Sequence, residues 1–183
     1  MSLGNAIHLV GASGSGTTSV GRRLADILCL PHYDTDTFYW EKSEVPFSQP
    51  REESDRIKML SLVLQSSDSW VLSGSLCGWG DVFVPRFTLV VWLRVNHDIR
   101  MKRLLARETA RYGDAILNGG EYEEMHKAFM YWAGGYDFSE DISRNASRHN
   151  NWLKDIECPV KVVFNEGTLD ETVNLIIDEL KIG

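Results

Sequence analysis

A glycine-rich segment near the start of the chain has the residue types and spacing that suit phosphate binding. The eight residues Gly11-Ala12-Ser13-Gly14-Ser15-Gly16-Thr17-Thr18 follow a short apolar run, Asn5 to Val10. Glycine lets the backbone pass close to an anion, and the loop N–H groups and the N-terminus of a following helix point at its oxygens. Thr18 stands where a hydroxyl would bind Mg²⁺ beside the phosphates. All eight residues are therefore predicted to bind a nucleotide.

One part of this motif departs from its usual form. The spacing is that of a P-loop, Gly-x-x-x-x-Gly-Lys-[Ser/Thr], but Thr17 occupies the position of the lysine. That lysine places a point charge on the β- and γ-phosphates, and losing one such contact costs roughly 3 kcal/mol of transition-state stabilisation. Three interpretations remain open: an arginine replaces the lysine, turnover is slow, or the site binds nucleotide without transferring a phosphoryl group.

Two aspartates, Asp34 and Asp36, lie at the end of the second predicted strand, which begins at Tyr33. In an extended segment, alternate side chains point to the same side. Two carboxylates beside a triphosphate can hold Mg²⁺ through water and orient an acceptor hydroxyl. We therefore expect Asp34 to hold or activate the acceptor and Asp36 to serve substrate and metal, with a helix or turn cap as the alternative for either residue.

Four further residues are candidate contacts to the acceptor. Trp40 ends an aromatic run that could stack on a base or sugar, or pack beneath a mobile lid. Ser73 and Gly74 end the third predicted strand, and Trp79 follows in a glycine-rich loop that brings backbone near the central cleft. A tight loop with a buried tryptophan is the alternative interpretation of this segment.

Arginines recur at a helical spacing of three and four over residues 98–112. They are Arg100, Arg103, Arg107 and Arg111. Side chains at this spacing share one helix face, and each guanidinium is a rigid donor fork that suits phosphate oxygens. We expect Arg103, Arg107 and Arg111 to neutralise a transferring phosphoryl group, and Arg107 and Arg111 are favoured because they adjoin a loop at 113–120 that could be a lid hinge. Arg144 and Arg148 form a second pair that could close over the nucleotide.

Strands and helices alternate along the chain. Apolar runs predict strands at 5–10, from 33, and at 70–72, 88–95 and 159–164, and apolar periodicity predicts helices at 17–30, 51–65, 98–112, 121–136, 139–156 and 169–180. This pattern predicts βαβ units and a parallel sheet that is covered on both faces. Ligands of such sheets bind at the carboxyl ends of the strands, where the glycine-rich loop would lie.

Composition excludes several other classes of protein. The chain has 183 residues, which suits a single domain, and its net charge of −7 argues against nucleic-acid binding. No apolar run reaches the roughly 20 residues of a membrane span, and no secretory signal is visible, so a cytoplasmic location is expected. The three cysteines show no metal-binding or disulfide spacing.

Taken together, the pattern resembles the adenylate kinase-like and shikimate kinase-like group of small P-loop kinases, in a variant form without the P-loop lysine. The resemblance spans nearly the whole chain and rests on five features: Gly11–Thr18, Asp34-Thr-Asp36, Ser73-Gly74, the arginines from Arg100 to Arg111, and Asn165-Glu166-Gly167. It implies a three-layer P-loop NTPase fold with a five-stranded parallel sheet, a helical lid at about 113–150 within one domain of residues 1–183, ATP as phosphoryl donor, and Mg²⁺.

The predicted function is therefore an ATP-dependent kinase that acts on a small-molecule acceptor, with a nucleoside monophosphate among the candidates. The Asp-Gly-(Phe/Tyr)-Pro-Arg segment typical of adenylate kinases is absent, and this leaves the acceptor open. One alternative is a regulatory nucleotide-binding module with weak or no transfer, which Thr17 supports. Another is an NAD-dependent enzyme, because Gly11, Gly14 and Gly16 also fit a dinucleotide turn and Asp34 lies 20 residues after Gly14.

Overall fold

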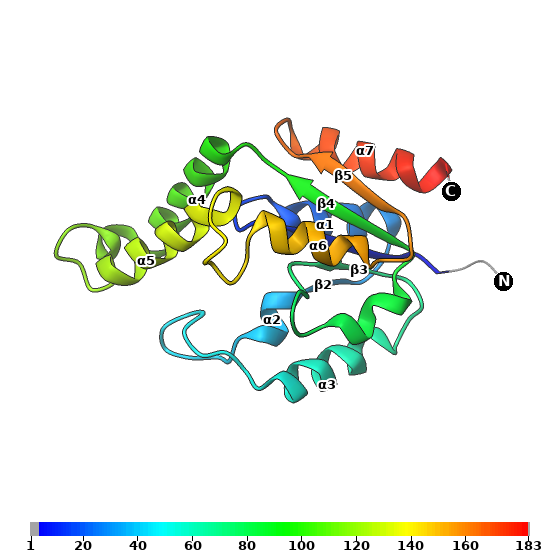
Figure 1. The fold of residues 1–183 in the computed structure, drawn as a ribbon, viewed down its shortest axis with the longest axis horizontal. Helices are drawn as coiled ribbons and strands as arrows, with labels where there is room; N and C mark the ends of the chain where they lie inside the picture. The colour runs from blue at the N-terminus through cyan, green and yellow to red at the C-terminus, as the bar shows by residue number, and fades with distance from the viewer. Residues whose placement is uncertain (1–3, 183) are drawn as a thin grey trace.

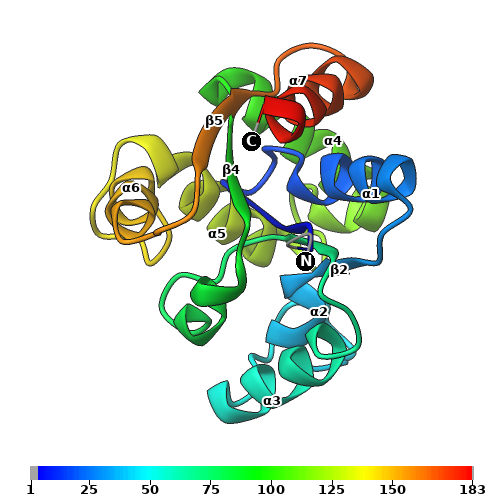
Figure 2. The same ribbon diagram turned by 90° about the vertical axis from the view of Figure 1, so that its right-hand side faces the viewer.

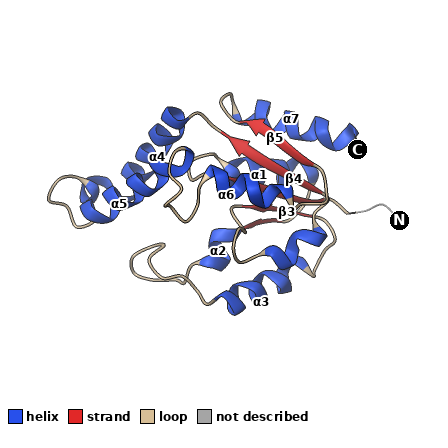
Figure 3. Ribbon diagram, in the orientation of Figure 1, coloured by secondary structure: helices blue, strands red, loops and turns tan. Residues whose placement is uncertain are grey.

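The structure of the protein, a computed structural model, describes residues 4–182 apart from the side chains of residues 181 and 182. The ends of the predicted 1–183 domain, residues 1–3 and 183, lie outside the described residues. Strands and helices alternate along the described chain, and the strands gather at the centre of the molecule (Figure 3).

The strands are β1 (Ala6–Gly11), β2 (His32–Asp34), β3 (Trp70–Ser73), β4 (Leu89–Arg94) and β5 (Val160–Phe164). They form one five-stranded sheet in the order β2-β3-β1-β4-β5, in which every neighbouring pair is parallel. The predicted α/β fold with a five-stranded parallel sheet is thus confirmed. A dinucleotide-binding fold places its second strand beside the first. Here β3 lies between them, so the strand order favours the P-loop interpretation.

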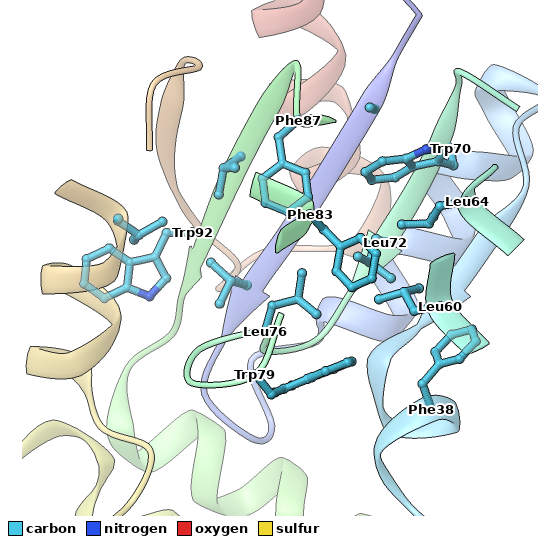
Figure 4. Packing of buried hydrophobic residues seen from close by; sticks show 14 residues of the cluster. Phe38, Leu60, Leu64, Trp70, Leu72, Leu76, Trp79, Phe83, Phe87 and Trp92 are labelled. Carbon is cyan, nitrogen blue, oxygen red and sulfur yellow. The ribbon is translucent and has the colours of Figure 1, made fainter. Parts of the chain in front are cut away.

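Alternation along β1 divides the core between the two faces of the sheet. Ile7 and Leu9 pack in one cluster with α1 (Thr17–Leu28) and α7 (Leu169–Ile182). Ala6 and Val10 pack in the other cluster with α3 (Glu53–Leu64), η1 (Asp81–Arg86) and α6 (Ala146–Lys154). Figure 2 shows α1 and α7 on one side of the sheet and α6 on the other, and Figure 4 shows the aromatic and leucine side chains of the second cluster. The three central strands β1, β3 and β4 are mostly apolar because both of their faces are buried.

A helical arm extends beyond the carboxyl ends of the strands (Figure 1). It contains α4 (His97–Tyr112), η2 (Gly113–Ile116), α5 (Glu123–Gly134) and η3 (Gly135–Asp137). The predicted lid at about 113–150 falls within this arm and the first residues of α6. The helix predicted at 139–156 is shorter than expected, because the Asn145 side chain caps α6 by accepting the N–H of Arg148 at 2.8 Å.

Two local predictions are wrong. The segment after β2 is not extended, because the carboxylate of Asp34 accepts the N–H of Asp36 at 3.0 Å and starts the short helix α2 (Thr35–Tyr39). The first helix ends at Leu28 and not at Leu30, because Cys29 turns into the left-handed region with φ 54° and its N–H bonds the carbonyls of the last turn. Over residues 4–182, no helix is both long and apolar enough to cross a membrane.

Candidate functional site

A cavity of about 1120 Å³ opens at the carboxyl edge of the sheet, between the glycine-rich loop, α2, α4, α5 and α6. It brings together residues from Gly11 to His149. Of the predicted site residues, all but Ser15 and Ser73 line it. A second cavity of about 490 Å³ lies between η1 and the end of α6, and none of the predicted site residues lines it.

The glycine-rich loop is held from behind by two polar side chains. Asn165 follows β5, and its Nδ2 donates to the carbonyl of Ser15 at 2.8 Å while its Oδ1 accepts from Thr172 Oγ1 at 2.8 Å. Arg100 of α4 donates to the carbonyl of Ser13 at 3.3 Å. Gly16 has φ 88°, and a Cβ on it would lie 2.5 Å from Asn165 Nδ2, so this position requires glycine. Side chains of the protein itself therefore hold the loop in this shape.

Ser15 does not face the cavity. Its side chain is fully buried inside the loop, and its N–H donates to the carbonyl of Ala12 at 3.0 Å. Ser15 therefore does not line the cavity, because the turn uses this residue for its own closure, and its predicted part in nucleotide binding stays a prediction.

Arg100 also departs from the other arginines of its helix. It is 1% exposed and donates to the carbonyl of Ala133 at 2.7 Å and to Asp137 at 3.0 Å. These bonds tie α4 to η3 and to the carbonyl of Ser13, so Arg100 has a structural role. Arg103, Arg107 and Arg111 line the cavity as the helical spacing predicts.

Thr18 and Asp34 join the first helix to the end of β2. Thr18 Oγ1 donates to Asp34 Oδ2 at 2.6 Å, and the other carboxylate oxygen accepts the N–H of Asp36. The sheet register sets Asp34 beside Ser73 and Ser73 beside Leu9, two residues before the glycine-rich loop begins. Asp34 therefore lies next to the residues that would surround a bound phosphate, and the ribose-binding role of a dinucleotide site is not supported.

Asp36 stands in the wall of the cavity near positive charge. Its carboxyl is open to the cavity, but the surrounding protein and the neighbouring Asp34 raise its pKa above the ordinary aspartate value, and Arg144 and Arg107 oppose that rise. A carboxyl with a raised pKa can exchange a proton more readily near neutral pH. The two aspartates thus have different environments although they are two residues apart.

The cavity is strongly positive in an otherwise acidic protein. Six arginines line it against only two acidic side chains, Asp34 and Asp36. The arginines are Arg22, Arg103, Arg107, Arg111, Arg144 and Arg148. In the part of the chain that the structure describes, only Arg107 of these forms a salt bridge, with Glu108 at 3.5 Å, while Arg107 and Arg144 also act at longer range on Asp36. Such a surplus of unpaired guanidinium groups suits a ligand with several negative charges.

The predicted acceptor contacts differ in position. Trp40 is half-buried in the cavity wall and packs edge-on against Tyr39 and Phe47, with centroid distances of 4.8 and 6.1 Å. Trp79 lines the cavity but is only 6% exposed, so it packs in the hydrophobic core and also forms part of the cavity wall. Ser73 is buried behind Gly74, where His32 Nε2 lies 2.9 Å from its hydroxyl and Asp34 lies 3.5 Å away. Ser73 therefore supports Asp34 and does not contact the cavity.

The residues present fit a magnesium ion that is shared with a ligand. Among the described residues, no group of three or more histidine, cysteine or acidic side chains could hold a metal alone. Mg²⁺ in phosphoryl-transfer sites is held by one or two protein oxygens and by the phosphates of the substrate. The adjacent oxygens of Thr18 and Asp34 match that donor set. The sequence predicts the metal at Thr18 and Asp36, but Asp34 is the aspartate that contacts Thr18.

Comparisons with known proteins agree with this geometry. The chain is 40% identical over 174 residues, 95% of this chain and 96% of the other, to the Bacillus subtilis protein named Uncharacterized protein YqaC. It is 25% identical over 131 residues to a cytidylate kinase of Pyrobaculum islandicum, covering 66% of this chain and 70% of that enzyme. The solved shikimate kinase from Acinetobacter baumannii in complex with shikimate shares the fold, with a TM-score of 0.56 at 17% identity over 97% of this chain and 93% of that chain.

The family assignment rests on the N-terminal two-thirds of the chain. Residues 7–127, from β1 through the first turns of α5, match a family described as an AAA domain, AAA_18. This range contains the glycine-rich loop, Asp34, Asp36 and the arginines of α4. The chain belongs to the AAA_18 family of P-loop small kinases, which is distantly related to cytidylate and shikimate kinases.

Proposed function

We propose that this protein is an ATP-dependent phosphotransferase that moves the γ-phosphoryl group to a small-molecule acceptor, with a nucleoside monophosphate as the first candidate. One observation carries the proposal: a preformed glycine-rich loop, the Thr18–Asp34 pair and six arginines face a single cavity. The names of the relatives, cytidylate kinase and shikimate kinase, supply the classes of acceptor to be tried first.

The donor nucleotide would bind with its phosphates along the loop. The loop N–H groups and the N-terminus of α1 point at anionic oxygens, and Asn165 and Arg100 keep the loop in that shape. Thr18 and Asp34 would hold Mg²⁺, which supplies charge neutralisation and orientation of the phosphates when bound.

The acceptor would bind between α2, the β3 exit and α6. Its nucleophilic oxygen forms a bond to the γ-phosphorus while the bond from that phosphorus to the bridging oxygen breaks and ADP leaves. A monophosphate acceptor attacks with a phosphate oxygen and gives up no proton to the protein. A hydroxyl acceptor transfers its proton to a carboxylate, for which Asp34 and Asp36 are positioned at the cavity wall.

The arginines of the cavity are the groups that can compensate for the missing lysine. Thr17 lines the cavity and no lysine of the described chain does, so the positive charge there comes from guanidinium groups. Arg103, Arg107 and Arg111 approach from α4, and Arg144 and Arg148 approach from the region of the predicted lid. Closure of that region around ATP would bring the two groups nearer to the transferring phosphoryl group.

A phosphorus NMR time course tests the proposal directly. The protein is incubated with ATP, Mg²⁺ and, in separate samples, nucleoside monophosphates, shikimate and gluconate. A new phosphoester or phosphoanhydride signal that grows with ADP supports the kinase and identifies the acceptor. ADP with free phosphate alone points to hydrolysis, and it contradicts transfer to the acceptors tried.

The second candidate is a nucleotide-binding module without efficient transfer, and the presence of Thr17 in the cavity wall favours it. In that case the ATP resonances broaden on addition of protein while the spectrum does not change with time. Substitution Thr17→Lys then separates the two functions, since a kinase site that lacks only its lysine gains turnover.

A further inference from the structure

Three of the arginines that line the cavity each lie over an aromatic ring that lines the same cavity. The distances from the guanidinium carbon to the ring centre are 5.0 Å for Arg111 over Phe47, 5.6 Å for Arg107 over Phe129 and 5.6 Å for Arg144 over Trp132. All three fall within the roughly 6 Å range of a cation–π contact. A ring face attracts a guanidinium group without neutralising its charge, and it leaves the N–H donors, which lie in the guanidinium plane, free for a ligand.

The contact between Arg111 and Phe47 joins two different parts of the molecule. Phe129 and Trp132 both belong to α5, within the helical arm. Phe47 instead belongs to the loop at 41–50, which follows α2, whereas Arg111 is in the last turn of α4. Figure 1 shows this loop in cyan, beside α2 and below the arm. The contact therefore links the arm to the β2 side of the cavity.

The loop that carries Phe47 is held in shape by its own hydrogen bonds. Its base is closed by an antiparallel bridge between Trp40 and Pro50. Near its tip, the hydroxyl of Ser48 donates to the carbonyl of Val45 at 2.7 Å. These bonds present the ring of Phe47 at the cavity wall.

The backbone of Phe47 has an unusual conformation for a bulky residue. Its φ of 61° is in the left-handed region, which costs free energy that other contacts must offset. The hydrophobic core does not explain this, because Phe47 is 44% exposed and is in neither of the two core clusters. The ring instead contacts Trp40, with a centroid distance of 6.1 Å, and Arg111. Residues with such a strained backbone gather at functional sites.

Arg111 depends on aromatic contacts for its position. Among the described residues, its side chain forms no salt bridge and no hydrogen bond, and it is exposed. The guanidinium group lies over the ring of Phe47 and, at 5.8 Å, over that of the neighbouring Tyr112. A long side chain without such contacts keeps its rotamer freedom, which a ligand would have to remove on binding.

We propose that Phe47 is a positioning residue, whose ring holds the guanidinium group of Arg111 at the cavity wall with its charge and its N–H donors available to phosphate oxygens. The proposal rests on the proposed function, in which Arg111 meets the transferring phosphoryl group. A donor group that is fixed before the reaction stabilises developing charge without being reordered at that moment. The loop at 41–50 thereby completes a cluster of arginines that belongs to other elements.

Substitutions that separate the ring from its apolar bulk test this inference. Phe47→Leu keeps an apolar side chain and removes the ring, whereas Phe47→Tyr keeps the ring. With ATP, Mg²⁺ and an accepted acceptor, Phe47→Leu should lower kcat about twofold to fivefold, the size of one cation–π contact at an exposed site. Phe47→Tyr should retain the wild-type rate. Tyr131→Leu is the control, because Tyr131 is an exposed aromatic residue outside the cavity, and it should leave kcat unchanged.

A double-mutant cycle shows whether Phe47 acts through Arg111. In an Arg111→Ala background, Phe47→Leu should have no further effect on kcat, because the group that it positions is gone. A loss of the same size in that background would mean that Phe47 acts by another route, and it would overturn the inference. An unchanged kcat in Phe47→Leu, or a rate for Phe47→Tyr that is no better than that of Phe47→Leu, would overturn it as well.

Proton NMR of the Arg111 side chain gives a readout that needs no activity. Protons above the face of an aromatic ring are shifted upfield, and the Arg111 signals are identified by their absence in Arg111→Lys. They should be upfield in the wild-type protein and in Phe47→Tyr, and they should move downfield in Phe47→Leu. If no acceptor is phosphorylated, the proposed function fails, but this comparison still decides whether Phe47 holds Arg111. Arg111 signals that do not move in Phe47→Leu contradict the inference.

Discussion

Thr18 Oγ1 donates a hydrogen bond of 2.6 Å to Asp34 Oδ2, which joins the first turn of α1 to the carboxyl end of β2. The two residues are 16 positions apart, and neither strand nor helix pairing links them. The bond places a hydroxyl and a carboxylate oxygen side by side at the mouth of the glycine-rich loop. It is the contact in this cavity that best suits a phosphate-bound Mg²⁺.

Removal of either partner of this pair should therefore lower turnover more than stability. Thr18→Val and Asp34→Asn should each reduce kcat by roughly 10²–10³, the usual cost of one lost electrostatic contact in a transition state. They should also raise the Mg²⁺ concentration needed for half-maximal rate. Steady-state kinetics at varied Mg²⁺ measure both effects. Asp26→Asn is the matched control, because Asp26 is an exposed residue of α1 that does not line the cavity. Wild-type magnesium dependence in both variants would remove the assignment.

Thr17→Lys should increase phosphoryl transfer. The position lines the cavity and is half-buried, so a lysine there reaches the phosphate region as in an ordinary P-loop. A restored contact of this kind is worth up to ~3 kcal/mol, or on the order of a hundredfold in kcat. Thr17→Met, with a long uncharged side chain, is the control and should show no gain. An equal or lower rate with lysine would mean that the arginines already fill this role.

Arg107→Ala and Arg111→Ala should reduce kcat by at least roughly tenfold to a hundredfold while ATP affinity changes much less. The reason is that a guanidinium group that meets charge developing during transfer contributes to the transition state more than to the ground state. Parallel measurement of kcat and of the dissociation constant for a non-hydrolysable ATP analogue separates the two effects. Lys102→Ala on the same helix is the control, since Lys102 is exposed and outside the cavity. Unchanged turnover in both arginine variants would exclude them from catalysis.

Asn165→Ala should destabilise the fold and weaken nucleotide binding together. The substitution leaves the carbonyl of Ser15 and the hydroxyl of Thr172 without the bonds that Asn165 provides. Loss of such buried bonds costs about 1–3 kcal/mol of the free energy of unfolding. Urea denaturation and ATP-analogue binding measure the two effects. Asn151→Ala on the exposed surface of α6, where the side chain accepts a hydrogen bond from Lys154, is the control and should change neither.

Acid should destabilise the protein through its buried histidines. Burial lowers the pKa of His8 to about 4, although its bond to the carbonyl of Leu72 opposes this shift. Between pH ~6.5 and ~4 the unfolded chain binds a proton at this position that the folded protein does not, so the free energy of unfolding falls as pH falls. His8→Phe should reduce the slope of stability against pH by up to about 1.4 kcal/mol per pH unit in that range. Urea midpoints measured from pH 7 to 4 give the slope, and an unchanged slope would show that His8 is not held neutral.

The sequence by itself determined the sheet and the position of the phosphate loop. Glycines at positions 11, 14 and 16 and hydroxyls at 17 and 18 are local chemistry, and the spacing of apolar residues along strands and helices reports which faces are buried. The glycines, the hydroxyls and the apolar spacing each specify the conformation of a segment only a few residues long. For the same reason the arginines of α4 that face the cavity could be recognised from their helical spacing.

Tertiary structure alone decided which polar side chains meet. Asn165 reaches Ser15 across 150 residues, Arg100 reaches Ser13 across 87, and Ser75 meets His149 across 74. A helix face shows that Arg100 and Arg103 are neighbours, but only packing against η3 buries the first and leaves the second in the cavity. The same holds for Asp34. Its carboxylate accepts hydrogen bonds from the N–H of Asp36, which starts α2, and from the hydroxyl of Thr18. The second of these bonds depends on how α1 packs beside β2. Local sequence specifies elements because their energies are local, whereas these contacts depend on how distant elements pack.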